Sequence, residues 1–69
     1  MRTEIWESDP FSAKKSDLLA TVDTDYRFEK GDELYIDSGG KTMKVRIMHV
    51  WVHVKNGNQL TRDVLALKI

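Results

Sequence analysis

The segment that most constrains the fold is residues 42–55, which has the β-branched and aromatic content of one long β-strand. Its apolar residues change parity midway, from odd positions over residues 43–47 to even positions over residues 50–54. Side chains in a strand alternate between the two faces of a sheet. All of these apolar residues can therefore lie on one face only if the strand contains one extra, unpaired residue between the two halves. We therefore predict a bulge or sharp bend at residues 47–49, of the kind that curls small sheets into barrels.

The last strand is predicted at residues 59–69, after a loop at residues 56–58. A two-residue Asn-Gly turn would place Val54 opposite Gln59, an apolar residue opposite a polar one. A three-residue loop instead places apolar residues opposite one another along the hairpin. The pairs predicted on this basis are Val54–Leu60, Val50–Val64, Ile47–Leu67 and Val45–Ile69.

The rest of the chain also indicates strands. Residues 33–37 follow a turn at Gly31 and lead into a hairpin turn at Gly39-Gly40. Strands are also predicted at residues 1–7 and 18–23. Because Asp9 could cap a helix and Pro10 suits its first position, a helical turn is possible at residues 10–16. The prediction is one all-β domain spanning residues 1–69, a small, partly open barrel of about five antiparallel strands.

Composition sets outer limits on this domain. With 69 residues the chain allows one small domain, and without cysteine it has no disulfide and no thiolate metal site. The longest apolar run, residues 64–67, is far shorter than a membrane span, and no apolar leader begins the chain. We therefore expect a cytoplasmic protein with no membrane contact.

Residues 26–69 carry a pattern seen in small barrels. An aromatic stretch at residues 26–28, the Gly31-Asp32 turn and a strand precede a basic hairpin at residues 41–50, and an apolar strand at residues 64–67 follows. This order resembles the C-terminal part of PUA-like and ASCH-type barrels and, more loosely, SH3-like barrels. The resemblance implies a barrel fold and a role in binding RNA or nucleotides. Residues 1–25 lie outside it.

Catalytic and metal chemistry find little support in the sequence. The Gly40-Lys41-Thr42 run ends like a phosphate-binding loop, but Tyr35 replaces the required first glycine and a strand follows. His49 and His53 lie about 13 Å apart along one strand, at about 3.3 Å per residue, too far to share one ion. No serine lies in a nucleophile elbow. We expect a protein that is not an enzyme and uses no cofactor or metal.

Charge is divided between the two halves of the chain. Residues 1–37 have a net charge of −5, whereas residues 38–69 have a net charge of +5. Such asymmetry can mark a basic binding face, or the halves can neutralise each other within one fold. With the bulge in place, one non-core face would carry a basic and aromatic stripe. We define the stripe as Lys44, Arg46, His49, Trp51, His53 and Lys55, with Arg62 expected beside it near Trp51 and His53.

This stripe predicts a non-catalytic binding module. Lysine and arginine would contact phosphates while a base stacks on Trp51, which suits single-stranded RNA or other single-stranded nucleic acid. The alternative is a protein–protein adaptor or homodimer that uses the same face or an exposed edge strand. A third possibility is that residues 1–25 cover the stripe and their acidic side chains pair with it.

Overall fold

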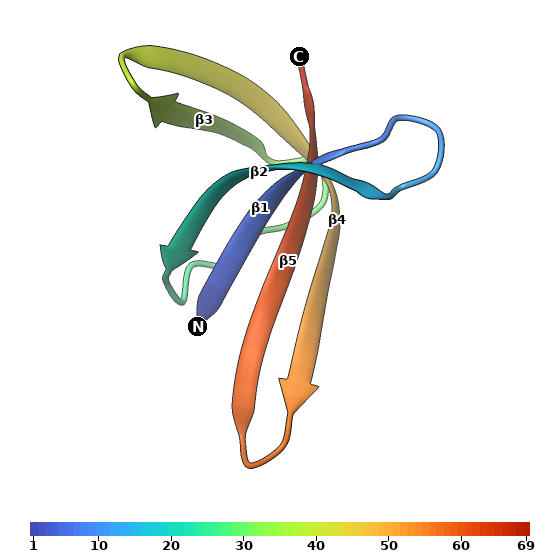
Figure 1. Ribbon diagram of the computed structural model, residues 1–69, viewed down its shortest axis with the longest axis vertical. Helices are drawn as coiled ribbons and strands as arrows, with labels where there is room; N and C mark the ends of the chain where they lie inside the picture. Colours follow the sequence, from blue (N-terminus) through green and yellow to red (C-terminus); the bar gives the residue numbers. More distant parts are fainter.

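The computed structural model describes residues 1–69 as five strands without a helix (Figure 1). The strands are β1 (Arg2–Ser8), β2 (Lys15–Asp23), β3 (Glu33–Ser38), β4 (Lys41–Lys55) and β5 (Gln59–Lys68). They form one sheet in the order β2-β1-β5-β4-β3, which curls into a half-barrel with β2 and β3 at its edges. The predicted small, partly open all-β barrel is confirmed. The structure contains no helix that could cross a membrane.

The sheet is mixed, because β1 and β5 run parallel while every other neighbouring pair is antiparallel. The prediction of purely antiparallel strands was wrong for this pair. Residues 24–32 carry the chain from β2, at one edge of the sheet, to β3 at the other edge. After this crossing, β5 returns in the middle of the sheet beside β1 and in the same direction. Local patterns predict hairpins but not such a pairing between strands far apart in the chain.

The bulge in β4 is confirmed. Ile47 pairs with Ala66 and His49 pairs with Leu65, so Met48 is the extra residue. The three-residue loop and the pairs Val54–Leu60 and Val50–Val64 are also confirmed. Beyond the bulge the predicted pairs were wrong by one residue, because β5 has no compensating irregularity. There, Ile47 pairs with Ala66 rather than Leu67, and Val45 pairs with Lys68 rather than Ile69.

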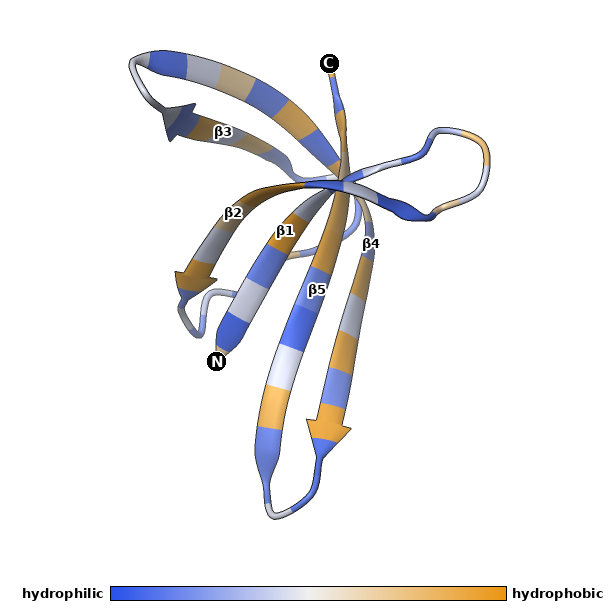
Figure 2. Ribbon diagram, viewed as in Figure 1, coloured by the Kyte–Doolittle hydropathy of each residue, from blue (hydrophilic) through white to orange (hydrophobic).

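The core lies on one face of the sheet, which we call the core face; the opposite face is the outer face. This face forms because apolar and polar residues alternate along the strands. Figure 2 shows the alternation as apolar and polar bands on β4. Phe28, from the segment that crosses between β2 and β3, packs against the core. The buried cluster consists of Ile5, Ile36, Val45, Ile47, Val64 and Ala66.

The helical turn predicted near residues 10–16 is absent, and β2 begins at Lys15 rather than at residue 18. Asp9 closes a hairpin loop instead of starting a helix. Its backbone N–H donates to the carbonyl of Lys14 at 2.8 Å, and its carboxylate accepts the N–H of Phe11 at 2.8 Å. Ala13 has a φ of 53°, outside the right-handed helical region. A side chain that bonds its own loop competes with helix formation here.

Candidate interaction surface

The six β4 members of the predicted stripe lie together on the outer face. Before the bulge, Lys44 and Arg46 alternate with the buried Val45 and Ile47. After the bulge, residues 49, 51, 53 and 55 alternate with Val50, which packs on the core. The extra residue in β4 therefore keeps both halves of the stripe on one face, as the parity change predicted.

Glu33 neutralises part of the charge at the basic end of the stripe, because its one carboxylate pairs with two cations. Its carboxylate lies 2.9 Å from Lys44 Nζ and 3.1 Å from Arg46 Nη2. The hydrogen bond from Lys44, followed by that from Arg46, lowers the pKa of Glu33, and the bond to Glu33 raises the pKa of Lys44. This part of the outer face is therefore an ion-pair group whose positive charge is reduced but not removed.

Asp63 is a central outer-face residue that sequence reasoning missed. It lies opposite Trp51, and its buried carboxylate accepts from Lys15 Nζ at 2.7 Å and contacts His53 Nε2 at 2.9 Å. Burial acts to raise the pKa of Asp63, but the bonds from Lys15 and His53 outweigh burial and lower it. The predicted hairpin register already placed Asp63 opposite Trp51, so the signal was present in the sequence.

The aromatic part of the stripe remains accessible to solvent. The rings of His49 and Trp51 stack with centroids 5.8 Å apart and planes at 21°. Trp51 is 41% exposed, and Lys55 at the end of the strand is exposed and forms no ion pair. From the N-terminal region, Trp6 lies beside the fully buried Leu65 in the middle of the sheet. Residues 1–25 thus cover part of the outer face but leave Trp51 accessible.

Arg62 does not belong to the stripe, which corrects the sequence prediction. It pairs with Val52, so its side chain lies on the core face, where only 6% of the residue is exposed. Its Nε donates to Thr3 Oγ1 at 2.9 Å, its Nη2 donates to the carbonyl of Thr24 at 3.2 Å, and its guanidinium lies 4.8 Å from the Phe28 ring centroid. Directly opposed residues share a face, which makes Arg62 a structural residue that holds the crossing segment.

The β4–β5 hairpin projects beyond the rest of the sheet (Figure 1). On its core face, Val52 is 53% exposed, Val54 is 77% exposed and Leu60 is 44% exposed. Figure 2 shows apolar bands on β4 and β5 near the end of the hairpin. β3 pairs with β4 only as far as Arg46, and the segment before β3 adds bonds to Ile47. The edge of β4 over residues 49–55 is therefore unpaired.

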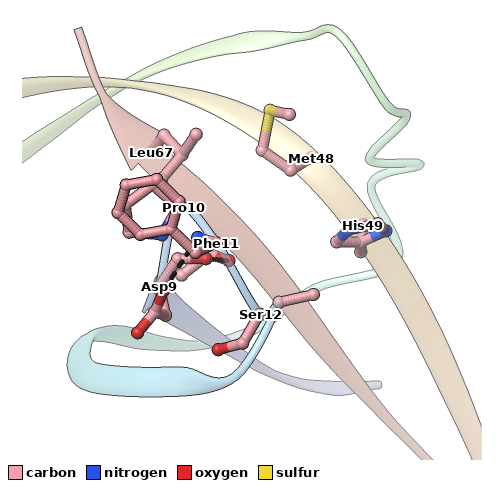
Figure 3. A pocket seen from close by; sticks show the side chains of 9 residues that line it. Asp9, Pro10, Phe11, Ser12, Met48, His49 and Leu67 are labelled. Atoms are coloured by element: carbon pink, nitrogen blue, oxygen red, sulfur yellow. Dashed lines mark hydrogen bonds between the residues drawn. The ribbon is translucent and has the colours of Figure 1, made fainter.

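A pocket of about 410 Å³ lies between the β1–β2 loop and the bulge (Figure 3). Met48, His49 and Leu67 form one side of it, and residues 8–13 form the other. Two polar side chains at the pocket bond within the loop: Ser8 Oγ donates to the carbonyl of Asp9, and the Asp9 carboxylate accepts from the N–H of Phe11. The pocket holds no paired acid and base. Nowhere in the structure do three His, Asp or Glu side chains gather as metal ligands.

Comparisons with protein-family models, curated proteins and solved structures find no match to this chain. The resemblance of residues 26–69 to PUA-like, ASCH-type and SH3-like barrels therefore stays a prediction.

Proposed function

We propose that this protein is a non-catalytic protein-interaction module whose contact surface is the β4–β5 hairpin. The observation that carries the proposal is the coincidence of an unpaired edge of β4 with three exposed apolar side chains, Val52, Val54 and Leu60. Exposed apolar side chains gathered in one place characterise interaction sites. An unpaired edge supplies a row of N–H and C=O groups for a partner strand.

Strand addition explains how both features act together. A partner strand beside β4 would bond its backbone to the edge, while its side chains would contact Val52 and Val54 on one face and Trp51 on the other. Backbone bonds would provide affinity and the apolar contacts would provide selectivity. Exposed tryptophan also ranks among the residues that contribute most at protein interfaces.

Single-stranded RNA is the second candidate ligand. The stacked His49–Trp51 pair favours it, since an exposed aromatic platform suits base stacking, and Lys55 at the strand end offers a free cation for phosphate. RNA ranks second because Glu33 pairs with both Lys44 and Arg46 and Asp63 pairs with His53. Phosphate contacts would have to displace these carboxylates.

An amide-resolved NMR titration tests the proposal. The first probe is an extended peptide selected from a displayed random library against the wild-type protein, and the second is a mixed-sequence single-stranded RNA at low and near-physiological salt. We expect the peptide to shift amides of residues 50–55 and Leu60, with little dependence on salt. The Val54→Lys variant should lose the peptide, because a charge would enter the apolar contact.

Tyr35→Lys is the matched control, since Tyr35 is 69% exposed on the edge strand β3, where it pairs with Lys44 and not with the open edge of β4. It should bind the peptide as the wild type does. Peptide shifts that map to β2 or β3 instead would contradict the proposal. RNA shifts at Lys44, Arg46, Trp51 and Lys55 that fade with salt, without peptide binding at the hairpin, would establish the second candidate in its place.

A further inference from the structure

We propose that the partner at the β4 edge is a second copy of this chain, with the two β4 strands antiparallel about a two-fold axis at Val52. This inference rests on the proposed function, because it uses the same unpaired edge and the same exposed apolar side chains. It adds the identity of the partner strand and its register.

The direction of the backbone groups on β4 sets that register. Ile47 donates its N–H to Asp32 and accepts from the N–H of Gly31, so core-facing residues of β4 point their backbone groups toward the β3 side. Past the bulge, Val50, Val52 and Val54 are again the core-facing residues of β4. Their backbone N–H and C=O groups therefore point away from β5 as well, to the open edge. An antiparallel partner exchanges two bonds with each residue of this kind.

One register uses all three of these residues in both copies. Val52 lies opposite Val52 of the second copy, and Val50 lies opposite Val54 of the second copy, which gives about six backbone hydrogen bonds. All side chains of these pairs are valines on the core face, so the exposed Val52 and Val54 gain apolar neighbours. On the outer face, Trp51 lies opposite His53 of the second copy, and such aromatic cross-strand pairs are favourable.

Charge also favours pairing between copies. Residues 49–54 contain no Lys, Arg, Asp or Glu, and the first charged residue of β4 beyond them toward the loop is Lys55. In this register Lys55 lies opposite His49 of the second copy. The two Lys55 side chains are therefore about 20 Å apart, at about 3.3 Å per residue, which exceeds the screening length of about 8 Å.

The two edge strands of the monomer, β2 and β3, carry charged residues, unlike residues 49–54 of β4. Natural sheets protect exposed edges with charged side chains, and both β2 and β3 have them. Residues 49–54 of the open edge have no such protection and expose valines instead, and Lys55 lies only at its end. Two-fold pairing occupies the open edge of both copies, so the assembly closes as a dimer and does not grow further. The charged residues of the other edges are Lys15, Asp17 and Asp23 in β2, and Glu33 and Asp37 in β3.

Cysteine crosslinking tests the axis, because the natural chain contains no cysteine. In this register the Cα atoms of the two Val52 residues would lie about 5.5 Å apart, within the range of a disulfide. We expect Val52→Cys to form a disulfide-linked dimer under mild oxidation roughly tenfold faster than Tyr35→Cys, because pairing raises the local concentration of the thiols. Tyr35 is the control because it is also exposed on an edge strand.

Sedimentation velocity on the unmodified protein gives an independent measurement that no altered residue can disturb. The wild type should sediment at twice the 8.0 kDa monomer mass as its concentration rises, and Val54→Lys should stay monomeric. Equal crosslinking of the two cysteine variants would overturn the inference, as would a wild type that stays monomeric at about millimolar concentration. A monomer that still binds the selected peptide at residues 50–55 would refute the second copy alone and leave the proposed function standing.

Discussion

Arg62 provides the sharpest test of the structural reasoning, because the sequence suggested a ligand contact and the structure gives it a role in folding. Replacement by alanine removes two hydrogen bonds from a charged donor, the contact with the Phe28 ring and the packing of the aliphatic stem. A hydrogen bond to a charged group contributes about 1.5–3 kcal/mol, which we reduce to about 1 kcal/mol each because water can enter the vacated space. The ring contact adds about 0.5–1 kcal/mol and the stem about 1 kcal/mol.

The sum, about 3.5–4 kcal/mol, is large for this protein. At 0.05–0.15 kcal/mol per residue, a domain of 69 residues has a total stability of about 3–10 kcal/mol. We expect Arg62→Ala to lose a third or more of its unfolding free energy and to melt about 10 °C lower or more. Urea unfolding followed by circular dichroism measures the loss. NMR relaxation should show faster motion in residues 24–32, which Arg62 holds through Thr24.

Arg46→Ala is the control, since Arg46 is exposed and pairs with Glu33 on the surface. Surface ion pairs contribute about 0–1 kcal/mol, so this variant should unfold close to the wild type. If Arg62→Ala loses less than about 1 kcal/mol, or less than Arg46→Ala loses, the core-face assignment of Arg62 is wrong.

Three further predictions concern packing, turns and pH. Ile47→Ala should cost about 2–5 kcal/mol in urea unfolding, because Ile47 is fully buried beside the bulge, and a loss below about 1 kcal/mol would contradict that burial. Gly40→Ala should cost about 1–2 kcal/mol in thermal unfolding, since Gly40 has a φ of 81°; an unchanged midpoint would argue against the turn geometry. The pKa of Asp63 lies below its ordinary value of 3.8, so the unfolded chain takes up the proton at a higher pH than the folded protein does. The stability that this carboxylate contributes is therefore present above about pH 4 and is lost as pH falls through the lowered pKa. Comparing urea midpoints at about pH 6 and pH 3 should therefore show a smaller fall for Asp63→Asn than for the wild type, and equal falls would contradict the role of Lys15 and His53.

The sequence alone determined the three strands after residue 32, the two hairpin turns between them and the bulge, but not the loop at residues 9–14 or the start of β2. Paired glycines at residues 39–40 and the apolar pattern around residues 56–58 fixed two hairpins, because turn chemistry and alternation act between neighbours in the chain. The parity change around Met48 located the bulge for the same reason. It also placed the six β4 residues of the stripe on one face, as the structure confirms.

Only the tertiary structure decided what surrounds these elements. The parallel pairing of β1 with β5, and the crossing of residues 24–32 that accompanies it, join parts of the chain far apart in sequence, which no local pattern encodes. The same crossing buries Arg62 and leaves the edge of β4 open beyond Ile47. Whether a charged side chain is free or paired also depends on its neighbours in space. The pairing of Glu33 with Lys44 and Arg46, and that of Lys15 with Asp63, became visible only once the strands were assembled.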